Sequence, residues 1–204
     1  MDKNELAASV VFYFPTIDQL KNIRNYINDV GHVYIYDNTP QKKKNYGEDF
    51  ILNFFSNIQR KKITYIFSGH NDGIGEALNV TSRLAIKNKY RYIITLDQDT
   101  IISKGIINRI RKGFDNEFLK KVGIIAPSVQ WTSCNAKRNS MRSKMIVHDT
   151  CLVITSGSIV NLKAFKKVGG FKSEFFIDEV DHDYCLKNIS KGFRVIKIDN
   201  VYLS

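Results

Sequence analysis

Apolar and polar positions alternate along the chain in two different periods. Continuous apolar, β-branched runs are typical of strands covered on both faces of a sheet. These runs occupy residues 9–14, 32–36, 63–67 and 92–96. Between them, apolar residues recur at helical spacing over 17–30, 50–58 and from about 74 to 85. Strands that alternate with helices predict right-handed crossovers and an α/β fold with a mainly parallel sheet.

The second half of the chain predicts a smaller, mixed β region. Strands are expected at 122–126, 151–155 and 194–198, and a polar loop from about 132 to 144. Asn161 is placed to cap a helix that runs through Val168 and stops at Gly169-Gly170. A last helix is expected from Asp178 or Glu179 to Gly192. We expect one globular unit over 1–204, with a nucleotide-binding half (1–100) and an acceptor-binding half (101–204).

Composition narrows the setting in which the protein works. Its three cysteines are widely spaced, which fits neither a disulfide framework nor a zinc site, so a reducing compartment is the simpler interpretation. No apolar run approaches the roughly 18 residues that a membrane span needs, and the first residues do not resemble a signal peptide. We therefore expect a cytoplasmic location, which is compatible with activity at the inner face of the membrane.

The net charge of +11 leaves several partners open. Such charge suits nucleic acid, an anionic membrane surface or an anionic small substrate. The basic residues are scattered in short groups without a recognisable nucleic-acid motif, so we expect no nucleic-acid partner. They form either solvated faces or a surface that meets anionic lipid or a lipid-linked acceptor.

Polar clusters follow three of the predicted strands. They are Asp37-Asn38, Ser68 to Gly73, and Asp97-Gln98-Asp99. In parallel sheets ligands bind beyond the carboxyl ends of the strands, so these clusters predict a site at one sheet edge.

Asp97 and Asp99 close an apolar strand, where two carboxylates repel each other and lose hydration unless a cation offsets both costs. Carboxylates bind Mg²⁺ or Mn²⁺, and such ions take phosphate oxygens as further ligands. A divalent metal and a diphosphate substrate are therefore expected here. The alternative is a pair of loop-capping aspartates.

Two other clusters have equally open interpretations. Asp37 could accept a hydrogen bond from a base or ribose, or it could form an Asx-turn before Thr39-Pro40. The segment with Asn71 and Gly73 could present a helix N-terminus to phosphate, or be a structural turn. It lacks the spacing of dinucleotide-binding and P-loop motifs.

A second acidic cluster begins the last predicted helix. Asp178 and Asp181 stand three residues apart and can share a helical face, with Glu179 on another. One of these carboxylates could act as a general base. The alternative is an acidic first turn that complements the helix dipole.

These motifs, taken in order, resemble those of family 2 inverting glycosyltransferases with the GT-A fold. The series comprises Asp37-Asn38, Asn71-x-Gly73-x-Gly75-x-Ala77-x-Asn79, Asp97-Gln98-Asp99, Thr155-Ser156-Gly157, and Gly169-Gly170-Phe171 before the acidic helix. The form of the tripeptide and the pattern over 176–186 are most similar to rhamnosyltransferase-type members.

The resemblance implies a role for individual residues. Asp37 would contact the base of the donor, Asp97 the ribose or base region, and Asp99 the metal. Asp181 would be the catalytic base, with Asp178 and Glu179 as alternatives. Gly157 and Ser158 would line the pocket for the donor sugar and acceptor.

The implied function is transfer of a sugar such as rhamnose from a nucleoside-diphosphate donor to a saccharide or lipid-linked acceptor, with inversion, in bacterial surface polysaccharide synthesis. A metal-binding histidine often follows the last strand in such enzymes, and this chain stops there, so we expect it to lack a C-terminal extension. One rival is a non-catalytic nucleotide-sugar or glycan-binding module. A haloacid-dehalogenase-like phosphatase fits less well, because Ile101 stands where that family has Thr or Val.

Overall fold

The computed structural model describes residues 1–41, 46–129 and 144–203. The loop predicted over 132–144 lies, except for Lys144, outside the described residues, and so does Cys134. Cys151 and Cys185 are both free thiols. Within the described part of the chain, no helix combines the length and the apolar character that crossing a membrane requires.

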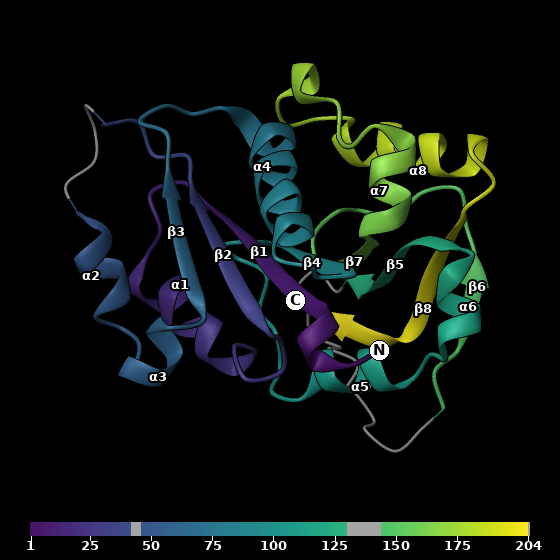
Figure 1. Cartoon of the computed structure of the whole chain (residues 1–204), viewed down its shortest axis with the longest axis horizontal. Coiled ribbons are helices and arrows are strands. Elements are labelled where there is room, and N and C mark those ends of the chain that lie inside the picture. Colours follow the sequence, from purple (N-terminus) through teal and green to yellow (C-terminus); the bar gives the residue numbers. More distant parts are fainter. Residues whose placement is uncertain (42–45, 130–143, 204) are drawn as a thin grey trace, which may run out of the picture.

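One sheet of eight strands runs through the described residues (Figure 1). The strands are β1 (Leu6–Phe12), β2 (His32–Asp37), β3 (Ile63–Phe67), β4 (Tyr92–Asp97), β5 (Val122–Val129), β6 (Val147–Asp149), β7 (Ser158–Asn161) and β8 (Arg194–Leu203). Their spatial order is β3-β2-β1-β4-β7-β5-β8-β6.

The sheet changes character halfway across. Strands β3, β2, β1 and β4 are all parallel, so their carboxyl ends meet at one edge. Strand β7 then runs antiparallel to both β4 and β5, β8 is parallel to β5, and β6 is antiparallel to β8. The predicted α/β class, with a parallel half and a mixed β region, is confirmed.

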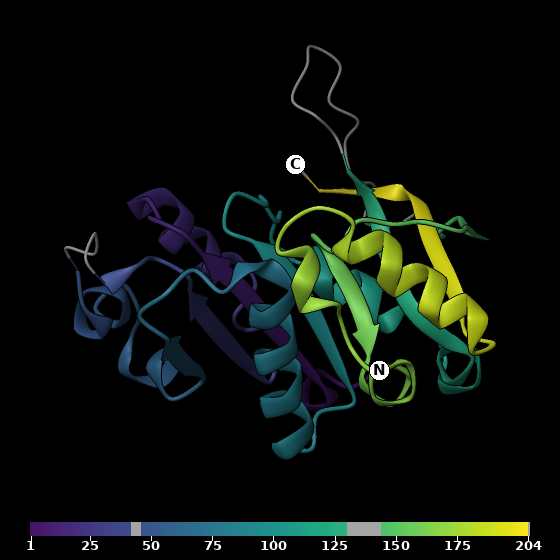
Figure 2. The same ribbon diagram turned by 90° about the horizontal axis from the view of Figure 1, so that it is seen from above.

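Helices cover both faces of this sheet. They are α1 (Ile17–Asn22), α2 (Glu48–Leu52), α3 (Asn57–Arg60), α4 (Gly73–Lys87), α5 (Ile106–Lys112), α6 (Asn116–Lys120), α7 (Leu162–Val168) and α8 (Val180–Ser190), with short 3₁₀ turns at Lys3–Glu5, Ile23–Asn25 and Ser173–Phe175. Helices α4, α7 and α8 lie together on one face, as Figure 2 shows from that side. Helices α1, α2, α5 and α6 contribute to the core on the other face.

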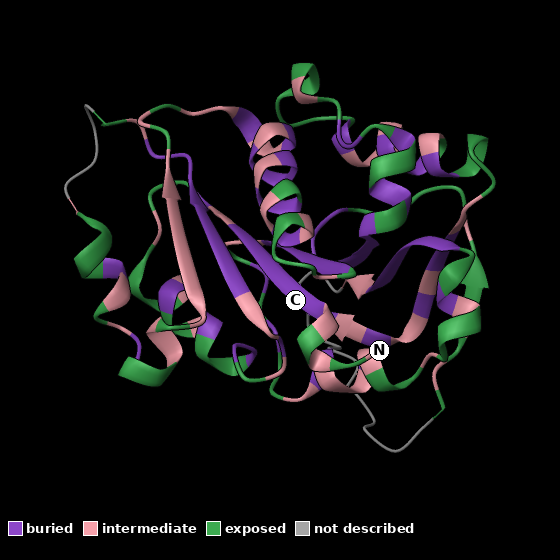
Figure 3. Cartoon of the chain, viewed as in Figure 1, coloured by how far each residue is buried: buried purple, intermediate pink, exposed green. Residues whose placement is uncertain are grey.

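The central strands are buried on both faces, as their continuous apolar sequences predict. Along β1, Ala8 and Val10 point to one core and Ala7 to the other. Figure 3 shows β1, β2 and β4 as mostly buried, whereas the edge strand β3 is half-buried. Burial on both faces explains why the alternation typical of solvent-facing strands is missing here.

Two predicted helices are shorter than expected. Thr16 caps α1 in the predicted capping box with Gln19, but α1 ends at Asn22 and a 3₁₀ turn follows. The later apolar positions are still buried, so packing on the sheet satisfies the pattern without a regular helix. Likewise the helix predicted over 50–58 is two helices, α2 and α3, because Ser56 begins α3 with a new capping box.

The strand predicted at 151–155 is wrong. Strand β7 begins at Ser158, after a turn in which Gly157 has a φ of 79°. In the preceding segment Val153 is buried in the core, whereas Leu152 and Ile154 are exposed, so its apolar character reflects packing and surface positions rather than pairing.

Helices α5 and α6 and strand β6 were not predicted. The last helix begins at Val180, one or two residues later than expected.

Candidate active site

The Asp97-Gln98-Asp99 tripeptide lies at the parallel edge of the sheet. Asp97 is the last residue of β4, and the Thr100 N–H donates back to its carbonyl oxygen at 3.2 Å, which makes a turn. The Gln98 amide accepts from the Tyr13 N–H at 2.8 Å and donates to the Tyr13 carbonyl at 3.0 Å. Gln98 thus ties the loop after β4 to the loop after β1.

Asp97 lies among other carboxylates. Burial raises its pKa to about 6, and the negative charges of Asp99 and Asp181 act in the same direction. Asp181 lies in the first turn of α8, which follows β7 in the sequence and is therefore distant from β4 along the chain. The structure therefore brings the end of β4 and the start of α8 together at one site.

Ser156 is a site residue to which the sequence assigned no role. Its hydroxyl accepts the Asp97 N–H at 3.4 Å, contacts the Thr100 hydroxyl, and hydrogen-bonds to the Asp97 carboxylate, which opposes the rise of the Asp97 pKa. The sequence feature that could have pointed to Ser156 is its place in the Thr155-Ser156-Gly157 motif.

The three acidic residues at the start of α8 are not equivalent. Asp178 and Glu179 precede the helix and are exposed, so the shared helical face expected for Asp178 and Asp181 does not form. Glu179 has a φ of 64° and pairs with His182 at 2.8 Å. Asp181 is half-buried, and it is the member of this cluster whose charge acts on Asp97.

Asp37 is fully buried at the end of β2. Its Oδ1 atom accepts the Thr39 N–H at 2.9 Å, which is the Asx-turn considered from the sequence. The Tyr65 and Tyr46 hydroxyls donate to the carboxylate at 2.5 and 3.2 Å. Burial raises the pKa of both tyrosines, so both stay protonated as donors. The Asp37 carboxylate thus organises the end of β2.

The segment before α4 forms a closed turn. Asn71 Oδ1 accepts the Gly73 N–H at 3.2 Å, and the Ile74 N–H donates to the Phe176 carbonyl at 2.7 Å. The first N–H groups of α4 therefore donate to other groups of the protein. This is what we expect if Asn71 and Gly73 form a structural turn.

Gly157 and Ser158 shape the start of β7. The Gly157 N–H donates to the Thr95 carbonyl at 2.7 Å, and a Cβ atom at Gly157 would lie 2.1 Å from the Leu203 side chain. Ser158 is fully buried, and its hydroxyl donates to the Ile154 carbonyl at 2.6 Å. Both residues lie beside the Asp97 site, but their groups are engaged with the protein interior.

A cavity of about 410 Å³ opens next to Asp99. Its lining includes Asn22 and Asn25 on the α1 side and Gln98, Asp99 and Ile101 on the β4 side. The Asn22 amide donates to the Thr100 carbonyl at 2.6 Å, which joins the two sides.

The oxygen atoms at this edge fit a hard divalent cation. Asp97 and Asp99 supply carboxylates, and a cation between them would offset both the burial that chiefly raises the pKa of Asp97 and the repulsion by Asp99 that adds to it. Among the described residues, no group of three or more His, Cys, Asp and Glu side chains is arranged to hold a metal. Two protein carboxylates suit Mg²⁺ or Mn²⁺ when water and phosphate oxygens complete the shell.

Comparison with known proteins gives a relative in sequence and several solved structures with the same fold. No known protein-family profile matches the chain. The chain is 28% identical to the dTDP-rhamnosyl transferase RfbF of Shigella flexneri over 208 residues, covering 97% of this chain and 68% of that protein.

Solved structures share the fold at low identity. TarS of S. aureus superposes with a TM-score of 0.69 at 12% identity, over 98% of this chain and 36% of TarS. GalNAc-T7, solved with UDP, GalNAc and Mn²⁺, gives 0.69 at 11% identity, over 99% of this chain and 44% of its own. A complex of TarS residues 1–349 with UDP-GlcNAc gives 0.63 at 11% identity, over 98% of this chain and 57% of that one.

The chain thus has the GT-A fold of glycosyltransferases. Within that class its sequence is similar to a rhamnosyltransferase, and the resemblance predicted from the ordered motifs is confirmed.

Proposed function

We propose that this chain is a nucleotide-sugar glycosyltransferase that moves a sugar such as rhamnose to a saccharide acceptor with inversion. The observation that carries the proposal is the meeting of Asp97 and Asp99 with Asp181 at one sheet edge. A carboxylate pair for the donor and a separate carboxylate for the acceptor are the two parts that this chemistry needs.

Asp181 is the proposed general base. It accepts the proton of an acceptor hydroxyl while that oxygen bonds to the anomeric carbon from the face opposite the leaving group. The bond between the anomeric carbon and the diphosphate oxygen breaks, and its electron pair leaves with the nucleoside diphosphate. Attack from the opposite face inverts the anomeric configuration.

Asp97 and Asp99 are the proposed holders of Mg²⁺ or Mn²⁺, which when bound would supply positive charge to the departing diphosphate. Ser156 keeps the Asp97 carboxyl group in place through its hydrogen bonds. Gln98 holds the loop after β4 against the loop after β1 through its hydrogen bonds to Tyr13. The donor would lie between these two loops.

The donor is proposed to lie over the carboxyl ends of the parallel strands, within 1–100, and the acceptor over 101–204. Asp37, Asn71 and Gly73 would shape the donor side, and Gly157 and Ser158 would support the β7 side. Similarity to a dTDP-rhamnosyl transferase favours dTDP-rhamnose as donor. A lipid-linked saccharide at the cytoplasmic face of the membrane is the acceptor we propose.

The test compares three neighbouring carboxylates. With radiolabelled dTDP-rhamnose and Mn²⁺, we expect Asp181→Asn to lower turnover by about 10²- to 10⁴-fold, the usual contribution of a general base. Donor binding, measured by calorimetry, should stay within a few-fold of the parent chain. Asp178→Asn and Glu179→Gln are the matched controls, because both side chains are exposed and precede the helix.

The outcomes separate the alternatives. Full turnover in Asp181→Asn, with turnover lost in either control, would transfer the role of base to that control residue. Metal-dependent donor binding without turnover in the parent chain would instead favour a nucleotide-sugar-binding module.

A further inference from the structure

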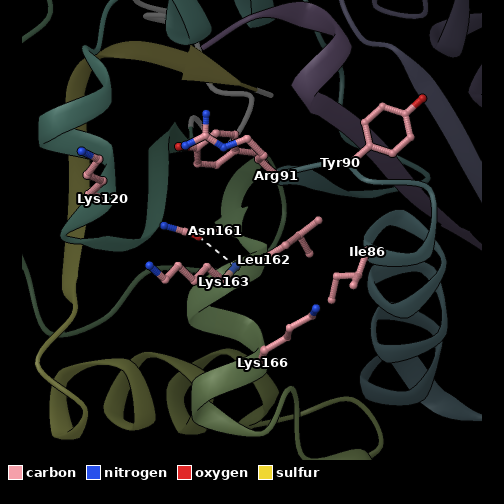
Figure 4. Close-up of a pocket in the computed structure, with 9 residues that line it drawn as sticks. Ile86, Tyr90, Arg91, Lys120, Asn161, Leu162, Lys163 and Lys166 are labelled. Carbon is pink, nitrogen blue, oxygen red and sulfur yellow. Dashed lines mark hydrogen bonds between the residues drawn. The ribbon is translucent and has the colours of Figure 1, made fainter.

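A second cavity lies at the opposite end of the sheet from the carboxylates. It measures about 350 Å³ and opens between the end of α4, the start of β4, α6 and the start of α7 (Figure 4). Its lining consists of Ile86, Tyr90, Arg91, Tyr92, Lys120, Asn161, Leu162, Lys163 and Lys166. Tyr92 begins β4 and Asp97 ends it, so at about 3.3 Å per residue the two sites are roughly 17 Å apart.

Every charged residue that lines this cavity is cationic. Arg91 is paired with Glu5 at 2.6 Å, and Lys120 with Glu117 at 2.5 Å. The ammonium groups of Lys163 and Lys166 have no ion-pair or hydrogen-bond partner within the part of the chain that the structure describes. The cavity therefore holds an excess of positive charge that the protein itself does not neutralise.

The wall of the cavity combines buried apolar side chains with a buried, hydrogen-bonded amide. Leu162 is 2% exposed and Tyr92 3%, and the Arg91 guanidinium lies 5.7 Å from the centre of the Tyr92 ring. Asn161 is buried as well, and its amide donates to the Leu119 and Val122 carbonyls at 3.2 and 2.9 Å. A buried apolar wall beside exposed cations suits a ligand that joins an anion to a less polar body.

We propose that this cavity binds a phosphate group, held by Lys163 and Lys166 with Arg91 at the opposite wall. A phosphate offers several strong acceptor oxygens to cations that approach from different sides, and lysine binds it as a point charge. The site is independent of the proposed transferase reaction, because a full strand length separates it from Asp97.

The first experiment measures phosphate binding directly. Inorganic pyrophosphate is titrated into ¹⁵N-labelled chain in the presence of EDTA, which leaves the carboxylate edge without a cation to attract anions. We expect saturable shifts of the Arg91, Lys163 and Lys166 amide signals. In the Lys163→Gln/Lys166→Gln variant the dissociation constant should rise roughly tenfold, since two charge-assisted contacts are lost.

A matched variant controls for net charge. Lys61 and Lys191 are exposed lysines outside the cavity, so Lys61→Gln/Lys191→Gln removes the same charge elsewhere. At fixed ionic strength this variant should bind pyrophosphate like the parent chain. All four lysines are exposed, so both variants should keep the parent melting temperature.

A second arm distinguishes the source of the phosphate. Vesicles of phosphatidylcholine with and without phosphatidylglycerol are sedimented with each variant. Binding to the anionic vesicles that only the cavity variant loses would support a lipid headgroup. Pyrophosphate binding without vesicle binding would support a soluble phosphate ligand. Absence of both, or equal weakening in the two variants, would overturn the proposal.

Discussion

The Asp97 carboxyl group depends on residues that lie far from it in the sequence. Asp181 adds negative charge from α8, whereas Ser156 donates a hydrogen bond from the turn before β7. The neighbouring Gln98 points away from this group and holds the Tyr13 backbone instead. Within the tripeptide, the middle position therefore supports the structure, and Asp97 and Asp99 are the positions proposed to hold the metal.

Burial of His32, at the start of β2, makes the stability of the protein depend on pH. Burial lowers its pKa below the ordinary 6.5, so the folded chain binds this proton less readily than the unfolded chain. Stability is therefore complete above about pH 6.5 and falls as the pH drops through the folded-state pKa. We predict that His32→Gln makes the melting temperature less dependent on pH over this acidic range. His70→Gln, at an exposed histidine, is the control, and an unchanged slope in His32→Gln would contradict the prediction.

Helix α4 and the segment before α8 depend on each other at the scale of elements. The N-terminus of α4 is covered by residues 173–177, since the Ile74 N–H donates to the Phe176 carbonyl. Gly73 permits this approach: its φ is 77°, and a Cβ atom there would lie 2.6 Å from the Phe176 carbonyl oxygen. The glycine-rich stretch is therefore needed for packing at this position, and it helps to position α8.

Replacing Gly73 by alanine tests this packing. We predict that Gly73→Ala lowers the free energy of unfolding by about 3 kcal/mol, because the left-handed backbone is strained and the new methyl group meets Phe176. Gly169→Ala separates the two causes, since Gly169 has a φ of 86° but no atom within 4 Å of a Cβ atom. That control should lose only about 1 kcal/mol in urea unfolding. Equal losses would mean that the Phe176 contact is unimportant.

At the scale of the whole molecule, the parallel half is joined to the mixed half both through the sheet and through the helices. Strand β7 pairs with both β4 and β5, so the sheet continues without a break. On the helical side, the buried Asn79 side chain accepts the Phe171 N–H at 2.9 Å and donates to the Phe171 carbonyl at 2.8 Å. The Asn79 link sets the path of the chain towards Asp181.

Removal of this link should affect both stability and catalysis. We predict that Asn79→Ala lowers the free energy of unfolding by about 2–4 kcal/mol, because two buried backbone groups of Phe171 lose their partner. Sugar transfer should fall as well, since α8 loses an anchor. Ser82→Ala, on the same helix, is the control: the Ser82 hydroxyl is buried without a partner among the described residues, so its removal should change stability by less than about 1 kcal/mol. Similar losses in both variants would refute a special role for Asn79.

The sequence by itself determined the parallel half of the fold and the order of the motifs. Strands buried on both faces are read from local apolar runs, and the positions of β2, β3 and β4 were predicted to within one residue. The capping box at Thr16 and the cap at Asn161 were equally clear, because each is a contact between near neighbours in the chain.

Only the tertiary structure decided the start of β7, the contact of Ser156 with Asp97 and the nearness of Asp181 to the same carboxyl group. Each depends on contacts between residues distant in the sequence: β7 on pairing with β4 and β5, Ser156 on Asp97, and Asp181 on the same carboxyl group. An apolar run at 151–155 satisfies the local pattern of a strand equally well, but it has no partner strand to pair with. Local patterns carry propensity and burial, whereas pairing and charge interactions exist only once the chain has folded.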